Sequence, residues 1–241
     1  MDWTDHGIVL ASRRHGETSA IATLLTRDHG RHAGLVRGGS GKRMRAVLQP
    51  GNTVAAHWRA RLAEHLGTYT LELERAEAAA LLDDPTRLAG LSAACALVET
   101  ALPEREPHAG LYAGFVDLLA ALASDGWPTA YVRWELALLA ELGFGLDLTR
   151  CAATGRNDQL AFVSPKTGRA VSISAGEPYK DVLLPLPAFL VSDAIAGEPA
   201  AVADGLKLTG YFLERHVYGH LHRGLPPARD RLVQRLQPRH G

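Results

Sequence analysis

The sequence predicts an α+β protein in which a small closed β-barrel is followed by an α-helical domain. Short β-branched runs separated by glycine-containing turns fill the first 80 residues. From about residue 81, apolar residues recur at three- and four-residue steps, as in amphipathic helices. A segment rich in Gly, Thr and Ser at residues 151–175 interrupts this pattern and indicates a small hairpin insertion. We therefore expect two domains, residues 1–80 and 81–241.

Five strands are expected in the N-terminal domain, with the sequences HGIVLASRR, SAIATLLT, RHAGLVRG, NTVAAHWRARL and GTYTLELER. The fourth strand alternates between an apolar and a basic face. Its apolar face holds Val54, Ala56, Trp58, Ala60 and Leu62, and its other face holds His57, Arg59 and Arg61. Because no long helical pattern lies among the five strands, a five-stranded OB-fold barrel is the leading candidate, with Trp58 pointing into its core.

Amphipathic helices are expected in the second domain. Two sets of apolar residues have helical spacing: Leu88, Leu91, Cys95, Val98 and Leu102, and then Leu111, Phe115, Leu118, Leu119 and Leu122. The sequence DGWPTAYVRWELALLAELGFG predicts a third helix, capped by Asp125 and ended by Gly143, that is apolar almost all round and therefore central. A short helix is expected within LPLPAFLVSDAIAG, and a last one over 199–223 with Leu213, Val217 and Leu221 on one face.

The composition indicates a cytoplasmic protein. No stretch approaches the roughly 20 uncharged apolar residues that a membrane helix requires. The N-terminal sequence MDWTDHG has acidic residues where a signal peptide would have basic ones. The cysteines, Cys95 and Cys151, offer no disulfide framework and fit a reducing compartment, with each expected to be a small buried residue.

Charge is unevenly distributed along a chain whose formal net charge is zero. Residues 1–80 hold 11 basic and 8 acidic side chains, residues 81–150 hold 4 and 10, and residues 151–241 hold 11 and 8, which gives +3, −6 and +3. Within residues 13–61 there are 10 basic side chains against Glu17 and Asp28, an excess of 8. This pattern predicts an anion-binding surface on the N-terminal domain.

The basic, glycine-rich stretch VRGGSGKRMRAVLQPG does not have the spacing of a nucleotide-binding P-loop. That motif requires a glycine where Val36 stands and a hydroxyl residue where Arg43 follows the Gly-Lys pair. A flexible turn with these charges suits a repeating polyanion better than one buried phosphate, although a solvated surface loop has the same composition.

The sequence has little that indicates catalysis. No nucleophile elbow, zinc-protease motif or dinucleotide fingerprint is present, and Asp83 and Asp84 precede a predicted helix, where carboxylates serve as caps. His216 and His220 are four residues apart on a predicted helix, with His222 nearby, so a metal hydrolase is one alternative. A partly exposed helix face is the interpretation we favour. We expect no cofactor and no enzymatic activity.

The basic side chains of the predicted barrel are the strongest chemical signal. They are Arg13, Arg14, Arg37, Lys42, Arg43, Arg45, Arg59 and Arg61. An OB-fold could gather them onto one surface that binds nucleic acid, usually with aromatic platforms for the bases. Because Trp58 is expected inside and Tyr69 is a weak candidate, phosphate contacts should dominate, with little sequence preference and steep salt dependence.

Several segments together give a family resemblance. The stretch from GIVLASRR to VLQPG, with the Gly-Glu-Thr turn at 16–18, the turn at 26–30, the basic loop and Leu-Gln-Pro at 48–50, resembles the N-terminus of the RecO family of bacterial DNA repair and recombination mediators. The segments RWELALLAELGFGLDLTRCAATG and FLERHVYGHLHRGLPPARDRL extend this resemblance over nearly the whole chain.

The resemblance implies an N-terminal OB-fold and a helical domain in a nucleoid-associated protein that binds single- and double-stranded DNA and anneals complementary strands. It also implies assistance in loading RecA onto DNA coated with single-strand-binding protein (SSB), together with RecR and sometimes RecF. None of these activities requires nucleotide hydrolysis by the protein itself. An RNA-binding OB-fold module is the alternative, since composition does not separate DNA from RNA.

Two further expectations depend on this resemblance. Some family members hold zinc with four cysteines in the region that begins here at Cys151, but this chain keeps that cysteine alone, so we expect a hairpin without zinc. Arg133 in YVRWELALL stands where a basic residue of the family is implicated in binding the acidic C-terminal tail of SSB. The other interpretation is that Arg133 solvates an otherwise apolar helix.

Overall fold

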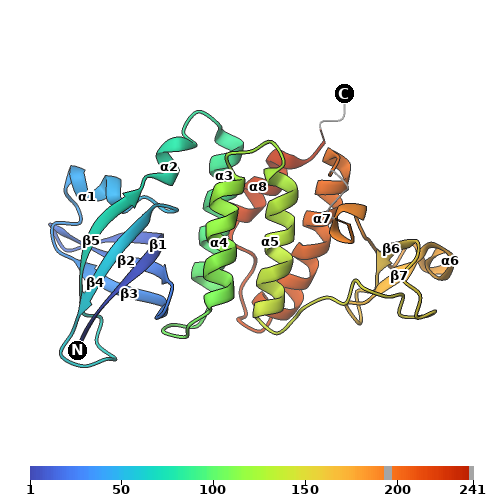
Figure 1. Ribbon diagram of the computed structural model, residues 1–241, viewed down its shortest axis with the longest axis horizontal. Coiled ribbons are helices and arrows are strands. Elements are labelled where there is room, and N and C mark those ends of the chain that lie inside the picture. Colours follow the sequence, from blue (N-terminus) through green and yellow to red (C-terminus); the bar gives the residue numbers. More distant parts are fainter. Residues whose placement is uncertain (193–196, 239–241) are drawn as a thin grey trace. The chain divides into compact units, whose positions relative to one another are not determined.

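The computed structural model describes residues 1–192 and 197–238 of the chain (Figure 1). Strands β1 to β5 come first along the sequence and helices dominate the rest, which confirms the predicted α+β class. The contacts divide the chain into two compact units. The first consists of Met1–Leu119 and Pro226–Arg229, and the second of Ala120–Leu225 and Asp230–Gly241.

The first unit contains the predicted five-stranded closed barrel. Its strands are β1 (Asp2–His15), β2 (Ser19–Thr26), β3 (Gly30–Val36), β4 (Thr53–Arg59) and β5 (Thr68–Arg75). They are hydrogen-bonded in the order β1-β2-β3-β5-β4, and pairing of β4 with β1 closes the barrel. The pair β3 and β5 is parallel, and the other neighbours are antiparallel.

Alternation along β4 places the side chains as the sequence predicts. Val54, Ala56 and Trp58 are buried in the barrel core, whereas His57 and Arg59 are exposed. The strand ends at Arg59, before the predicted end, because the chain then turns toward β5. Leu62 lies in that turn with 46% of its surface exposed, so its assignment to the core face was wrong.

Helices complete the first unit. They are α1 (Lys42–Val47), α2 (Glu77–Ala80), α3 (Pro85–Ala101) and α4 (Ala109–Ala121). The Asp84 carboxylate accepts hydrogen bonds from the backbone N–H groups of Thr86 (2.9 Å) and Arg87 (3.0 Å), which confirms it as the α3 cap. On α3 the Sγ of Cys95 lies 3.7 Å from the carbonyl oxygen of Val9. The compact unit that contains the barrel therefore extends beyond residue 80.

The second unit contains the helices α5 (Trp127–Glu141), α6 (Ile173–Gly176) and α7 (Pro199–Phe212). It also contains strands β6 (Leu160–Val163), β7 (Ala170–Ser172) and β8 (Leu184–Pro185). Helix α8 (Pro227–Leu236) has its first residues in the first unit and the rest in the second. Buried side chains surround much of α5, as predicted, but the N-cap position is Gly126 rather than Asp125. Strands β6 and β7 form the predicted hairpin, and β8 adds a third strand.

Two predicted helices differ in the structure. The segment expected to form a short helix has a 3₁₀ turn at Ala188–Leu190 after Leu184, and its residues 193–196 lie outside the described residues. The helix predicted over 199–223 changes at Leu213–Tyr218 to π geometry, and Leu221 is 43% exposed, so it does not share the buried face of Leu213 and Val217. Over the described ranges, no helix is long and apolar enough to cross a membrane.

Candidate nucleic-acid interface

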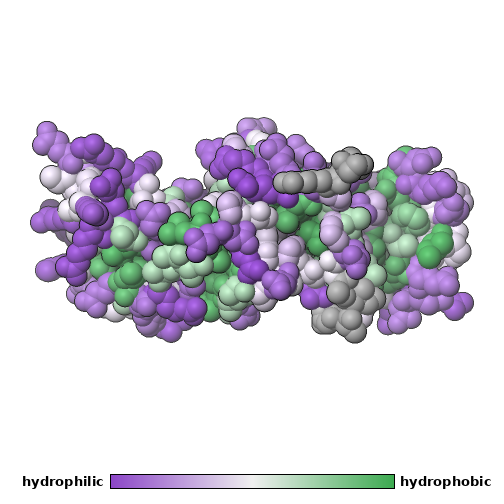
Figure 2. All heavy atoms as spheres, turned by 90° about the horizontal axis from the view of Figure 1, so that it is seen from above, coloured by the Kyte–Doolittle hydropathy of each residue, from purple (hydrophilic) through white to green (hydrophobic). Residues whose placement is uncertain are grey.

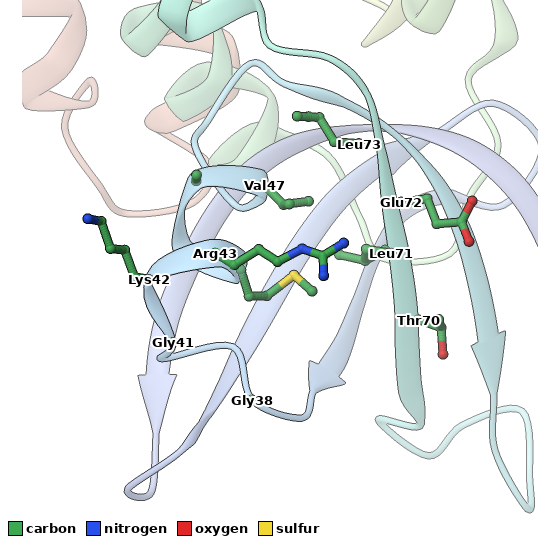
Figure 3. Close-up of a pocket in the computed structure, with 11 residues that line it drawn as sticks. Gly38, Gly41, Lys42, Arg43, Val47, Thr70, Leu71, Glu72 and Leu73 are labelled. Atoms are coloured by element: carbon green, nitrogen blue, oxygen red, sulfur yellow. The ribbon is translucent and has the colours of Figure 1, made fainter.

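The basic loop lies beside β5 and borders a hollow of about 1020 Å³ (Figure 3). Rather than forming the predicted flexible turn, it continues into α1 at Lys42. This helix forms because Met44 and Val47 pack against the barrel core, while the amide of Asn52 donates to the carbonyl oxygens of Ala46 (2.9 Å) and Val47 (3.2 Å). In Figure 3 the Arg43 side chain extends toward β5 and Lys42 extends away from it.

The backbone before α1 is tied to the turn between β1 and β2. Ser40 donates from its N–H to the Thr18 carbonyl oxygen and from its hydroxyl to the Ser19 carbonyl oxygen, both at 3.0 Å. Gly38 has φ of +70°, and a Cβ at Gly39 would collide with Ala20, so glycines are required for this path. The loop therefore presents its charges from a fixed backbone.

Strand register brings two more arginines to this end of the barrel. Arg13 pairs with Ile21 and Arg14 with Ala20, and Ala20 pairs in turn with Val36 at the start of the loop. We call the resulting set the loop cluster; it consists of Arg13, Arg14, Arg37, Lys42, Arg43 and Arg45, all exposed. Figure 2 shows mostly hydrophilic residues over the end that the barrel and α1 occupy at the left of Figure 1.

Arg59 and Arg61 form a separate group, which we call the turn pair. They border a hollow of about 800 Å³ with Met1, His65 and Gly67, whereas Lys42 and Arg43 border the hollow beside β5. The eight predicted side chains are thus divided between two groups. Within residues 1–192 and 197–238, none of the eight forms an ion pair, in contrast to Arg27, which binds Asp28 at 2.9 Å.

The aromatic residues are only partly as predicted. Trp58 points inward, with 2% of its surface exposed and its indole N–H donating to the Leu66 carbonyl oxygen at 3.0 Å. Tyr69 cannot act as a stacking platform because it is 3% exposed and its hydroxyl lies 2.9 Å from Nδ1 of His32. Burial raises the pKa of the Tyr69 phenol well above its usual value.

The sequence interpretation missed a group of aromatic rings at the start of β1. Trp3 stacks on His29, with ring centroids 4.0 Å apart and planes 9° from parallel, and on Trp58, at 5.5 Å and 22°. Burial, with smaller contributions from the charges of Arg105 and His29, lowers the pKa of His32 to about 4, so this imidazole is neutral near pH 7. Strand β1 starts four residues before its predicted start. The alternation of apolar Trp3 with polar Thr4 was the sequence signal that could have extended the predicted strand.

The histidines considered as metal ligands lie against phenylalanine rings. His216 stacks between Phe144 (5.4 Å) and Phe212 (5.8 Å), and His220 lies 6.3 Å from Phe144. His216 is partly exposed and His220 exposed, which confirms the favoured interpretation of a partly exposed face. Across the described part of the chain, no three His, Cys, Asp or Glu side chains converge as a set of metal ligands.

Cys151 begins the hairpin insertion and is buried, as predicted for both cysteines. Its sulfur accepts a hydrogen bond from the Ser172 N–H at 3.3 Å and lies 3.4 Å from the Ser172 hydroxyl. The backbone N–H of Cys151 donates to the Arg156 carbonyl oxygen at 2.7 Å. Hydrogen bonds within the chain therefore connect the two sides of the insertion at this position.

Arg133 on α5 is half-buried and contacts the 3₁₀ turn that contains Phe189. Its Nε and Nη2 atoms donate to the Phe189 carbonyl oxygen at 3.3 and 2.8 Å, and the guanidinium carbon lies 5.9 Å from the centre of the Phe189 ring. Two of the N–H groups with which Arg133 could bind a peptide carboxylate therefore already donate to a carbonyl oxygen of the same unit.

Comparison with known proteins covers nearly the whole chain. A family model described as recombination protein O N terminal matches residues 1–76, and one described as recombination protein O C terminal matches residues 82–224. The chain is 61% identical over 242 residues to a DNA repair protein RecO of Rhodospirillum centenum, covering 100% of this chain and 96% of that protein. The corresponding protein of Rhodospirillum rubrum is 55% identical over 244 residues, covering 98% and 97%. The resemblance inferred from the sequence is therefore confirmed, and the chain belongs to the RecO family.

Proposed function

We propose that this chain is a DNA repair protein that binds single- and double-stranded DNA through the basic side chains of its barrel and anneals complementary strands without acting as an enzyme. The observation that carries the proposal is the set of eight exposed basic side chains on the barrel that make no ion pair within the described ranges. Its relatives in the two Rhodospirillum species are named DNA repair protein RecO, which supports the role in repair.

Electrostatics gives the reason why such a surface promotes annealing. Two single strands repel each other through their phosphates, and a basic side chain that binds a phosphate releases condensed counterions. The hydrogen bonds of Ser40 hold the loop on an ordered backbone, so little backbone conformational entropy is lost on binding. Neutralised strands can then approach and pair, and the free energy of base pairing drives the reaction without ATP.

The proposal includes the partners implied by the family resemblance. In it the protein acts in the cytoplasm at the nucleoid, on single strands coated with SSB, and helps to load RecA together with RecR and, in some organisms, RecF. The SSB tail would bind near Arg133, where a guanidinium lies beside the aromatic ring of Phe189. Since Arg133 already donates to the Phe189 carbonyl oxygen, the tail carboxylate would have to share or replace that contact.

Fluorescence-detected annealing of two SSB-coated complementary oligonucleotides, without ATP, tests the central step. We expect the wild-type chain to accelerate annealing and the triple variant Lys42→Glu, Arg43→Glu and Arg45→Glu to lose the acceleration while keeping its circular dichroism spectrum. A matched control reverses three exposed basic residues of the second unit, Arg156, Lys166 and Lys180, and should anneal normally.

Three outcomes would contradict parts of the proposal. A wild-type chain that neither binds DNA nor anneals it at low salt refutes the function. Tighter binding to RNA than to DNA of the same sequence, without annealing, favours the RNA-binding module. For the SSB contact, unchanged affinity of Arg133→Ala for a fluorescent SSB-tail peptide would remove Arg133 from the binding site.

A further inference from the structure

Three aromatic rings stack in a column near the start of β1. Trp58 is buried, Trp3 stacks on it, and His29 stacks on Trp3 with its side chain 35% exposed. The His29 ring is held in place because its Nδ1 lies 2.9 Å from the buried Asp5 carboxylate. The column therefore ends in an oriented, partly exposed flat ring, which is the kind of surface on which a further ring can stack.

A hollow of about 620 Å³ lies beside this column. Trp3, His29 and His32 line it, together with the charged residues Asp2, Asp28 and Arg105. Arg105 is fixed by its own contacts, since its backbone N–H donates to the Arg31 carbonyl oxygen at 2.8 Å and its Nη2 donates to the His65 carbonyl oxygen at 3.0 Å. The hollow thus combines flat apolar rings with separate donors and acceptors.

This chemistry fits a nucleobase better than a phosphate. The Asp2 carboxylate at the border repels a phosphate but accepts hydrogen bonds from the exocyclic amino groups of bases, as acidic side chains do with cytosine N4, whereas the Asp28 carboxylate is already paired with Arg27 through Oδ2. A guanidinium donates to base carbonyl and ring nitrogen acceptors. Every base also has a π-face that can stack on an aromatic ring.

The hollow also adjoins the turn pair. Met1 borders both this hollow and the one that contains Arg59 and Arg61. In the strand register the pair Asp2–Arg59 lies next to the pair Trp3–Trp58, and alternation along β4 puts Arg59 on the exposed face, opposite to Trp58. A single strand that crosses Met1, with its phosphates on the turn pair, would bring a base to the aromatic column.

We propose that the hollow bordered by Trp3, His29 and Arg105 receives one unpaired DNA base, stacked on the His29 ring, while the turn pair binds the adjoining phosphates. The proposal rests on the DNA-binding function above and adds to it a site that recognises the base. It also explains the separation of the turn pair from the loop cluster, because the turn pair serves the strand whose base is held. This base would be unavailable for pairing until it is released.

The first experiment compares a fluorescent short oligodeoxycytidylate with an oligonucleotide of the same length made of abasic sites, which keeps the phosphates and lacks the bases. By anisotropy, the wild-type chain should bind the natural strand about 5- to 150-fold more tightly, the range expected for stacking of one base. Equal affinity for the two strands overturns the base site and leaves the phosphate surface intact. If neither strand binds, the proposed function fails as well.

Two substitutions of His29 separate stacking from the hydrogen bond to Asp5. His29→Phe keeps a flat ring and should keep the preference for the natural strand, whereas His29→Asn keeps a polar group without a stacking ring and should lose it. As a control, Arg59→Gln with Arg61→Gln should weaken binding of both strands by the same factor. Equal preference in His29→Phe and His29→Asn would show that the ring does not stack on a base.

Photocrosslinking tests the same site on the wild-type chain, so its result does not depend on whether a variant folds. Irradiation with an oligonucleotide that carries 5-iododeoxyuridine should crosslink the base to Trp3 or His29, identified by mass spectrometry of the digested adduct. Crosslinks found only at residues outside the hollow would overturn the proposal.

Discussion

Neutralising three residues of the loop cluster should change the salt dependence of DNA binding by a predictable amount. The perturbation is the combined change of Lys42, Arg43 and Arg45 to Gln, which removes charge while keeping good helix formers in α1. Each phosphate contact on a single strand contributes about −0.7 to the slope of log K against log salt concentration. If all eight exposed basic side chains bind phosphates, the wild-type slope is about −5.6 and the variant slope about −3.5.

These slopes translate into large differences in affinity. Between about 50 and 200 mM salt, the wild-type association constant should fall roughly 2000-fold and that of the variant roughly 130-fold. The assay is fluorescence anisotropy with an oligodeoxythymidylate at several salt concentrations, which avoids secondary structure in the DNA. The combined change of Arg156, Lys166 and Lys180 of the second unit to Gln supplies the matched control. Equal slopes for the wild type and the loop variant would refute the assignment of these residues to phosphate contacts.

Other predictions concern stability. Asp84→Ala should lower the free energy of unfolding by about 1 kcal/mol in urea titrations, because α3 loses its cap bond to the Thr86 N–H. Gly30→Ala should cost about 2 kcal/mol or more, since φ is +66° and a Cβ would collide with the Glu106 carbonyl, and an unchanged melting temperature would contradict this. The pKa of His32 is 6.5 in the unfolded chain and about 4 in the folded one, so the unfolded chain binds more protons between these pH values. The free energy of unfolding should therefore fall by at most about 3 kcal/mol as the pH decreases from 6.5 to 4. The variant His32→Gln should show a weaker dependence on pH over this range.

Local patterns in the sequence were sufficient to predict the barrel strands and the main helices. The alternation along β4 and the helical spacing on α3 each predicted a buried face. In the structure Trp58 and Cys95, which lie on those faces, are buried. The short helix α1 was missed because its six residues are too few for a periodic pattern, and its formation depends on Met44 contacting the barrel core.

The arrangement of the site could not be predicted in the same way. The pairing of Trp3 with Trp58 joins residues far apart in the sequence, and it follows from the register in which the barrel closes. The division of the basic residues also depends on the folded chain, since Arg59 and Arg61 border one hollow while Lys42 and Arg43 border another. Residue types indicated a polyanion, and the proposed positions of a base and of phosphates depend on the three-dimensional register.

The hydrogen bonds from Ser40 to the turn between β1 and β2 have a consequence for kinetics. A disordered basic loop would have to fold around each strand that it meets, and that step would limit the rate of association. Here the backbone is already ordered, so encounter with DNA should be limited by diffusion and long-range attraction. Solvent viscosity and ionic strength should then control the association rate, and substitutions in the loop cluster should alter the attraction without adding a slow step.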